Sequence, residues 1–217
     1  MADAVTDEVQ SRREQRRQRH QSLSRSQLLD AAEEVFGRKG FHETTLKEIA
    51  ELAEFSVGSV YSFFENKDDL FRQIFLRRGE EFEAGMADVF GDEVSPLARL
   101  HRLVDFQIGF FRKNRHFGRV YLRYSSIALL AARNDQVDEA VQKRYDTAME
   151  QQAELFRHGQ KSGDFRDGDP VVLSRLFSGL IASFQSVDPA VISDDDGSEE
   201  HLPLPEFHDL VERAFGA

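Results

Sequence analysis

Two short segments with helical apolar spacing, residues 46–53 and 57–64, each follow a hydroxyl side chain, Thr45 and Ser56 respectively. A hydroxyl in this place can cap the first turn of a helix, and Glu48 stands at the capping-box spacing from Thr45. The open N-terminus of a helix offers unpaired N–H groups and the positive end of a dipole to phosphate. The chemistry suggested is therefore recognition of a polyanion by helix ends.

Two short helices joined by a tight turn predict a helix-turn-helix, whose second helix enters the major groove by its N-terminal residues. Their apolar faces would pack on a preceding helix that starts near Ser24 and is capped at Gly40. The opposite face of the second helix would present small residues, which allow the backbone to approach DNA closely. These are Ser56, Gly58, Ser59 and Ser62, with Val57 at the tip.

The run TTLKEIAELAEFSVGSVYSFFENKDDLF, residues 44–71, resembles the DNA-binding head of the TetR (tetracycline-repressor-like) family of transcriptional regulators. The resemblance covers residues 24–75, about a quarter of the chain. It is carried by Thr44 or Thr45, Ile49-Ala50, Ala53, Ser56, Gly58, Tyr61, Phe64, Lys67 and Leu70-Phe71.

The resemblance implies a role in DNA binding for ten residues. By likeness to the family, the expected phosphate contacts are Thr44, Thr45, Lys47, Ser56, Ser59, Tyr61 and Lys67, and the expected base-facing residues are Val57, Gly58 and Ser62. Two alternatives stay open: Tyr61 could be a core ring packed on Phe41 or Phe64, and Ser56 could be a plain N-cap.

The run departs from the family pattern at two positions. Glu54 stands where the family often has a glycine in the turn, so a residue with a side chain has to hold a strained backbone. Val57 stands where a polar or basic side chain often reads bases. Because valine can contact a thymine methyl group but offers no hydrogen bond, the operator sequence does not follow from this helix.

Charge is unevenly distributed along the chain, which has a net charge of -11. Residues 1–78 hold 13 basic and 14 acidic side chains, whereas residues 79–217 hold 15 and 25. The run RREQRRQR places five arginines within residues 12–19. We expect residues 1–22 to form a disordered basic arm, which either follows DNA phosphates or is only a solvated tail.

Composition and motifs exclude several function classes. With no cysteine there is no disulfide, thiol nucleophile or cysteine metal site, and a cytoplasmic location fits. No apolar run is long enough to span a bilayer, and the N-terminus has no secretory signal. The GxxxxGK, GxSxG and HExxH motifs are absent from the sequence. We expect no enzyme, no cofactor and no metal site; only Glu154 with His158 stands out at ligand-like i, i+4 spacing, which is more typical of a surface contact.

Apolar spacing predicts an all-α fold of about nine helices with no internal repeat. We expect three parts: the basic arm over residues 1–22, a helix-turn-helix domain over 23–72, and a C-terminal ligand-binding and dimerisation domain over 73–217. Ser95 before Pro96 and the turn before Pro170 predict helix starts. Residues 188–200 are expected to form an acidic loop.

Aromatic and sulfur side chains recur at helical spacing after residue 80. For any one of them, packing in the core is the plainer interpretation, but together they could line a mostly apolar cavity. The family resemblance implies that a small, largely apolar or aromatic effector binds there and releases the DNA. The candidate ligand contacts are Phe82, Met86, Phe106, Phe110, Phe117, Tyr121, Tyr124, Met149, Gln152 and Phe177.

Two C-terminal helices are candidates for a homodimer interface, as the resemblance also implies. In the helix near 170–186, Leu173, Leu176 and Phe177 are expected to face the core, opposite a face of small residues such as Gly179. The helix near 205–215 is also amphipathic. A DNA-binding regulator controlled by a protein partner, with no small-molecule ligand, remains the alternative function.

Overall fold

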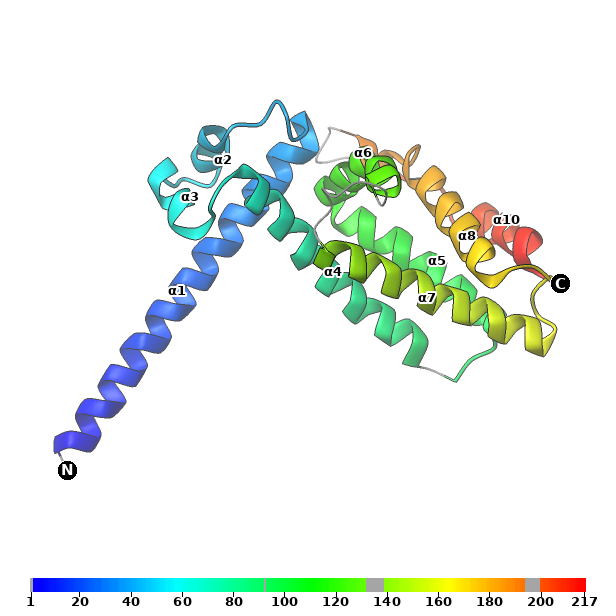
Figure 1. The fold of residues 1–217 in the computed structure, drawn as a ribbon, viewed down its shortest axis with the longest axis horizontal. Helices are drawn as coiled ribbons and strands as arrows, with labels where there is room; N and C mark the ends of the chain where they lie inside the picture. Colours follow the sequence, from blue (N-terminus) through cyan, green and yellow to red (C-terminus); the bar gives the residue numbers. More distant parts are fainter. Residues whose placement is uncertain (1, 92, 132–138, 194–199) are drawn as a thin grey trace. The chain divides into compact units, whose positions relative to one another are not determined.

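The computed structural model describes residues 2–91, 93–131, 139–193 and 200–217 (Figure 1). Over these ranges the chain forms ten helices and no strand, with an isolated bridge between Phe165 and Gly216. The predicted all-α fold class is therefore confirmed. The chain divides into two compact units, Met1–Gln73 and Ile74–Ala217. No helix in the described ranges is long and apolar enough to cross a membrane.

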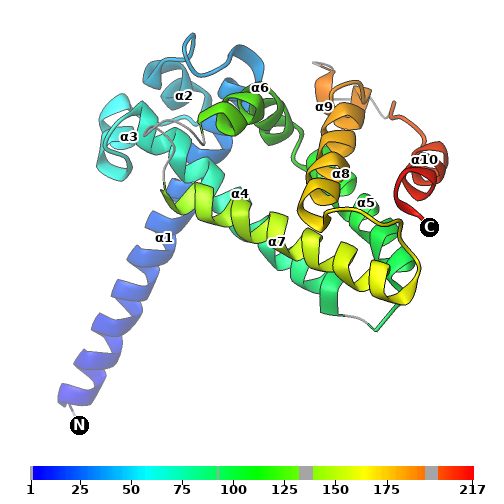
Figure 2. The same ribbon diagram turned by 45° about the vertical axis from the view of Figure 1, so that its right-hand side comes forward.

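The first unit contains α1 (Ala2–Lys39), α2 (Leu46–Leu52), α3 (Val57–Phe63) and the start of α4 (Lys67–Gly91). Figure 2 shows α2 and α3 as two short helices in succession. Apolar residues of all four helices build one small core, together with Phe64, which ends α3. This core fixes the geometry of the helix-turn-helix. Its buried members include Leu28, Leu29, Ala32, Phe36, Ile49, Ala50, Val60, Phe64 and Leu70.

The N-terminal half of α1 differs from the expected disordered arm. Residues 2–22 continue α1 as a helix, and residues 13–23 are exposed. The physical reason lies in the composition, because this stretch contains no Pro or Gly and is rich in Arg, Gln and Glu, which favour helix. The exposed arginines described there are Arg13, Arg16, Arg17 and Arg19.

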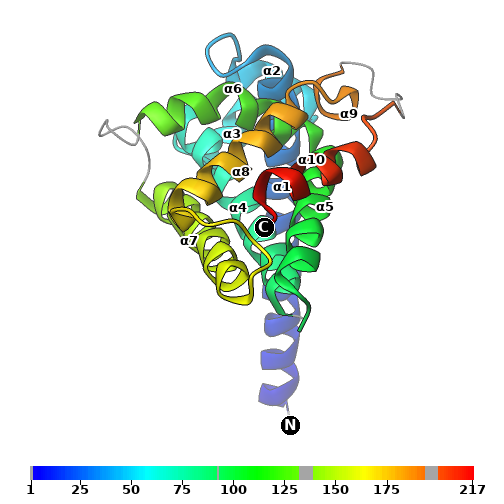
Figure 3. The ribbon, with the colours of Figure 1, turned by 90° about the vertical axis from the view of Figure 1, so that its right-hand side faces the viewer.

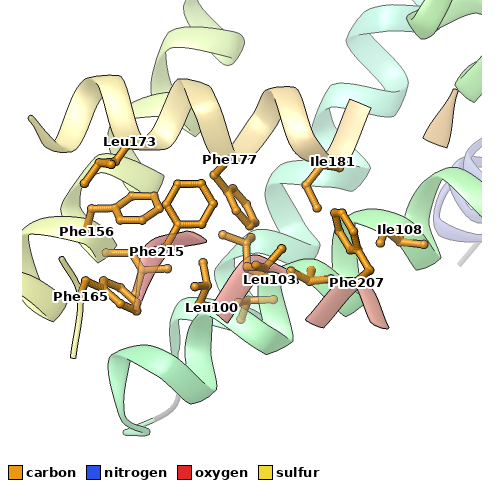
Figure 4. Packing of buried hydrophobic residues seen from close by; sticks show 14 of the residues in the cluster. Leu100, Leu103, Ile108, Phe156, Phe165, Leu173, Phe177, Ile181, Phe207 and Phe215 are labelled. Carbon is orange, nitrogen blue, oxygen red and sulfur yellow. The ribbon is translucent and has the colours of Figure 1, made fainter. Parts of the chain in front are cut away.

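The second unit is a bundle of α5 (Pro96–Lys113), α6 (Arg115–Ala131), α7 (Glu139–Ser162), α8 (Pro170–Gln185), α9 (Pro189–Ile192) and α10 (Pro205–Phe215), with most of α4. Helix α7 packs along α8, and α5 packs against α6, α7, α8 and α10. Figure 4 shows the core between these helices. There the ring of Phe156 meets those of Phe165, Phe177 and Phe215, with centroids 5.3–6.3 Å apart.

The short helix α9 corrects the expectation of a loop from residue 188 and adds one helix to the predicted nine. Asp188 accepts a hydrogen bond from the backbone N–H of Ala190 at 3.3 Å, and Pro189 is the first helical residue. An Asp-Pro pair is a helix-start signal, which the acidic composition of the segment concealed. Residues 194–199 of the predicted loop lie outside the described residues.

One face of α8 also differs from expectation. Leu173 and Phe177 are buried as predicted, but Leu176 is 57% exposed and Val172 is 51% exposed. These two residues, with Gly179, are spaced i, i+4 and i+7, so they share one stripe of the helix. The exposed stripe therefore contains large apolar side chains as well as a small residue.

Candidate nucleic-acid interface and ligand region

Helix α2 begins with the predicted capping box. The backbone N–H of Glu48 donates to Thr45 Oγ1 at 3.3 Å, and the backbone N–H of Thr45 donates to Glu48 Oε2 at 2.9 Å. Lys39 pairs with the same carboxylate, so Lys39 and Thr45 together hold the pKa of Glu48 at about 2. The start of α2 is thus fixed by local bonds, with Thr45 and Lys47 exposed.

The turn between α2 and α3 places Glu54 in the left-handed region of the backbone, with φ of 59°. The sequence predicted this strain, because the family often has glycine here. Phe55 continues the turn by donating its N–H to the carbonyl of Ala50 at 2.8 Å. An L-residue in this conformation costs about 1–2 kcal/mol. The turn keeps this conformation at the expense of local stability, and thereby sets the angle between the two helices.

Helix α3 opens at Ser56, whose Oγ accepts the backbone N–H of Ser59 at 3.0 Å. The predicted N-cap role of Ser56 is therefore confirmed. Gly58 is exposed, and a Cβ added there would meet no atom nearer than Ser56 Oγ at 3.8 Å. Packing does not require a glycine at this position. Its absent side chain leaves the backbone of the first turn open to a large partner.

Tyr61 projects from the same helix and is 57% exposed. The alternative of a core ring is therefore wrong, since Val60 and Phe64 fill the core at this end of α3. Ser62 is exposed, and its hydroxyl donates to the carbonyl of Ser59 at 2.6 Å. The phenol of Tyr61 is free of the core and can meet a phosphate.

Two of the predicted DNA contacts, Thr44 and Lys67, donate hydrogen bonds to backbone carbonyls between α1 and α2. Thr44 is buried, and its hydroxyl donates to the carbonyl of Gly40 at 2.7 Å. Lys67 is half-buried, and its ammonium donates to the carbonyls of Phe41 and Thr44 at 2.8 and 2.9 Å. The ammonium also lies 4.4 Å from the Phe41 ring centroid. Sequence reasoning missed these contacts, because they join segments 23 or more residues apart.

The structure brings the other predicted DNA contacts together on α3 and the start of α2. Six of the ten are exposed, three are half-buried and Thr44 is buried. The exposed six are Thr45, Lys47, Ser56, Gly58, Tyr61 and Ser62, and the half-buried three are Val57, Ser59 and Lys67. This surface is made of hydroxyls and open backbone at helix starts, which suits phosphate and groove contacts.

The stretch that forms this surface also matches a known family. Residues 28–74, which include α2, the turn and α3, match the family described as "Bacterial regulatory proteins, tetR family". The chain belongs to the TetR family. It is therefore a DNA-binding transcriptional regulator, a class of protein distinct from enzymes.

Similarity to TetR-family proteins extends beyond the head. The uncharacterised HTH-type transcriptional regulator YfiR of Bacillus subtilis (strain 168) is 28% identical over 159 residues, 73% of this chain and 76% of that protein. The ketosteroid transcriptional regulator KstR2 of Mycobacterium tuberculosis has a TM-score of 0.71 at 19% identity, over 89% of this chain and 95% of that one. AibR, crystallised with isovaleryl coenzyme A and operator DNA, has a TM-score of 0.64 at 18% identity, over 88% and 95%. At these identities the two structures show a shared fold.

Several predicted ligand contacts lie in the packed core of this TetR-family chain. Met86, Phe117 and Phe177 are buried. Gln152 on α7 is also buried, and its Oε1 accepts the hydroxyl of Ser178 on α8 at 3.0 Å. The half-buried Met149 has its sulfur 3.7 Å from the same hydroxyl. Core packing thus accounts for Met86, Phe117 and Phe177. Gln152 and Met149 instead contact the hydroxyl of Ser178 between α7 and α8.

Three predicted ligand contacts form a half-buried aromatic group between α4 and α5. The ring centroid of Phe82 lies 5.1 Å from that of Phe106 and 5.2 Å from that of Phe110. Phe106 and Phe110 line an open cavity of about 550 Å³. The other residues that line it are Glu81, Ala84, Asp105, Gly109, Lys113 and Asn114. The remaining eight predicted ligand contacts do not line this cavity.

Tyr121 on α6 is half-buried beside two phenylalanine rings. Its ring lies 5.0 Å from that of Phe111 and 6.1 Å from that of Phe117. Burial, and to a smaller extent Tyr145, raises the pKa of Tyr121 to about 12, yet part of its side chain stays accessible. Tyr124, three residues on, is also half-buried.

Proposed function

We propose that this protein is a homodimeric repressor that leaves its operator when a small, largely apolar or aromatic ligand binds its C-terminal unit. The observation that carries the DNA-binding part is the open first turn of α3 around Gly58, beside the exposed Tyr61. There the start of α3 faces away from the core, with the hydroxyls of Ser56 and Tyr61 and the bare backbone at Gly58. This arrangement fits insertion into a major groove.

The proposed contacts divide by chemistry. Thr45, Ser56, Ser59 and Tyr61 offer hydroxyls to phosphate, and Lys47 offers a charge. Val57, Gly58 and Ser62 face bases. Lys67 has one ammonium hydrogen beyond the two given to carbonyls, which leaves it one donor for a phosphate. We leave the buried side chain of Thr44 out of the interface.

The proposed dimer interface is the exposed stripe of α8 together with α10. Val172 and Leu176 are more than half exposed, and a Cβ added at Gly179 would meet nothing within 4 Å. On α10, Leu210 is 49% exposed, while Phe207 and Val211 are buried. Apolar side chains beside a flat glycine favour close packing of a second helix pair, and a two-fold axis would double both helices.

The proposed ligand region lies in the second unit, among Phe110, Tyr121, Met149 and Gln152. Aromatic faces with a few hydroxyl and amide groups are typical of sites for largely apolar ligands. The AibR structure, which has a similar fold, holds both an acyl-coenzyme A and operator DNA. That precedent supports the idea that one such fold can bind an organic ligand and DNA.

Binding and release can be tested in one series of measurements. The operator is first selected from a random duplex pool, and its half-sites should lie about 34–36 Å apart or at a multiple of that distance. Candidate ligands are then screened by thermal shift. A ligand that stabilises the protein and lowers fluorescence anisotropy on the operator supports the proposal. If no compound does both, and a protein partner releases the DNA instead, the ligand part is wrong.

The dimer is tested separately with Leu176→Asp. This change should yield a monomer by light scattering and abolish tight operator binding, while Leu176→Met should remain dimeric. A wild-type protein that is monomeric at micromolar concentration and still binds a single half-site tightly would contradict the proposal.

A further inference from the structure

We propose that the ligand of this protein is an uncharged carbonyl compound, such as a ketone or an ester, whose oxygen accepts a hydrogen bond from the amide group of Gln107 on α5. The inference rests on the proposed ligand-controlled function. It adds to that function the polar group by which the C-terminal unit would recognise its ligand. The observation behind it is a buried amide nitrogen that has no hydrogen-bond partner among the described residues.

Gln107 is a polar side chain in an otherwise apolar stripe of α5. The buried residues of this helix are Leu100, Leu103, Val104, Gln107, Ile108 and Phe111. Gln107 is 5% exposed, and its Nε2 is the buried nitrogen that lacks a partner. Burial of an amide donor that bonds to nothing costs free energy, and a leucine of similar size would avoid that cost. The amide at this position therefore does not serve the stability of the ligand-free protein.

Three helices of the second unit, α5, α7 and α8, pack against one another in pairs (Figure 3), and each of them buries a glutamine. Gln152 on α7 is satisfied, because its Oε1 accepts the hydroxyl of Ser178 on α8 at 3.0 Å. Gln185 on α8 is like Gln107, since it is 1% exposed and its Nε2 is also buried without a partner in the described part of the chain. The second unit thus contains two amide groups whose hydrogens are available to a bound molecule.

Of these two amides, Gln107 adjoins the proposed ligand region. It precedes Phe110 and Phe111 on α5 by three and four residues, the spacings at which side chains of a helix are neighbours. The ring of Phe111 lies 5.0 Å from that of Tyr121 on α6. An apolar ligand packed on these rings would therefore bring an oxygen atom to the amide of Gln107.

The chemistry of the amide nitrogen determines the class of ligand. An amide N–H2 group only donates, so its partner has to be an acceptor. The other side chains proposed for the ligand region, Phe110, Tyr121, Met149 and Gln152, are uncharged at neutral pH, so a carboxylate buried among them would lose its hydration without gaining a cation. A ketone or ester oxygen accepts the hydrogen bond and brings no hydrogen of its own. An alcohol would add a donor that needs a further partner.

The first measurement needs no ligand. Gln107→Leu should raise the melting temperature of the full chain by a few degrees, because it removes a buried donor that has no partner. Gln152→Leu is the matched control, since it removes a similarly buried amide that is hydrogen-bonded to Ser178. This second substitution should lower the melting temperature. If both substitutions lower it alike, the amide of Gln107 is a bonded part of the fold and the proposal is wrong.

The second measurement compares ketones with matched hydrocarbons on the wild type, by thermal shift and calorimetry in the absence of DNA. The pairs are acetophenone with ethylbenzene, benzophenone with diphenylmethane, and camphor with bornane. At least one ketone should bind about tenfold or more tightly than its hydrocarbon, because only the ketone gains the hydrogen bond. Gln107→Leu should abolish this preference, and so should Gln107→Met, a second apolar substitution. The proposal is overturned if no ketone binds, if ketone and hydrocarbon bind alike, or if the preference survives in the variants.

Release of DNA is measured separately, by fluorescence anisotropy on the selected operator. Ketones that bind through Gln107 and leave the DNA bound would support this inference and contradict the proposed release. Hydrocarbons that release the DNA as well as their matched ketones would support the proposed repressor and overturn this inference. The two proposals can therefore fail independently.

Discussion

The ammonium of Lys67 at the start of α4 donates a 2.9 Å hydrogen bond to the carbonyl oxygen of Thr44 at the start of the helix-turn-helix. With a second bond to the carbonyl of Phe41 at 2.8 Å, it joins α4 to the turn between α1 and α2. A side chain expected to contact only DNA therefore also stabilises the DNA-binding head. The two roles can be separated experimentally.

Lys67→Ala should lower the stability of the head as well as DNA affinity. It removes two charge-assisted bonds from a half-buried position, worth about 1–2 kcal/mol together after screening by solvent. We expect a melting temperature lower by a few degrees. Lys47→Ala is the control, because Lys47 is exposed and pairs only loosely with Glu51 at 3.6 Å. It should weaken DNA binding without a change in melting temperature. Equal melting temperatures for both variants and wild type would show that Lys67 has no structural role.

Tyr61→Phe should weaken binding to operator and scrambled duplex by similar factors. Loss of a neutral hydrogen bond to phosphate is worth about 0.5–1.5 kcal/mol, which corresponds to a two- to tenfold rise in Kd. Anisotropy titrations at matched salt measure both constants. Because the ring is more than half exposed, even Tyr61→Ala should leave the melting temperature unchanged. A wild-type Kd for Tyr61→Phe would rule out the phosphate contact.

Glu54→Gly should stabilise the protein. Glycine removes the strain of a φ of 59° but adds entropy to the unfolded chain, so the net gain is at most about 1 kcal/mol. Glu51→Gly is the control within α2, where glycine should destabilise by about 1 kcal/mol. Urea unfolding gives both values. If the two substitutions destabilise equally, the turn at Glu54 carries no strain.

The exposed arginines of α1 should contribute to the salt dependence of DNA binding. Each phosphate neutralised adds about -0.9 to the slope of log K against log salt. A variant with Arg13, Arg16, Arg17 and Arg19 changed to Gln keeps good helix formers, so α1 should persist. Its slope should be flatter, with sequence preference unchanged. An unaltered slope would make this part of α1 a solvated extension without a role in binding.

Local chemistry made the head predictable. Thr45 with Glu48 and Ser56 with Ser59 are capping interactions between residues three apart, so the helix starts can be inferred from the sequence. The strain at Glu54 could also be predicted, because the family that the run resembles often has glycine at this position of the turn. The α9 start at Asp188-Pro189 carried a similar local signal that was overlooked.

Contacts between distant segments could not be predicted in the same way. The sequence pattern does not specify which helix lies opposite a given side chain. This decides the burial of Thr44, the two hydrogen bonds of Lys67 and the exposure of Leu176. His208 on α10 contacts Asp105 on α5, although the two residues are 103 positions apart in the sequence. Only the packing of the two helices reveals this contact.

The central claim, that the open first turn of α3 meets DNA, is tested most directly by Gly58→Ala. The added methyl group has room in the protein and favours helix, so the variant should fold and be as stable as wild type or up to about 1 kcal/mol more stable. Anisotropy on the selected operator should nevertheless show a Kd raised at least about tenfold, because the methyl group occupies the space where the backbone approaches the groove. A stable Gly58→Ala protein that binds the operator with wild-type affinity would contradict the account.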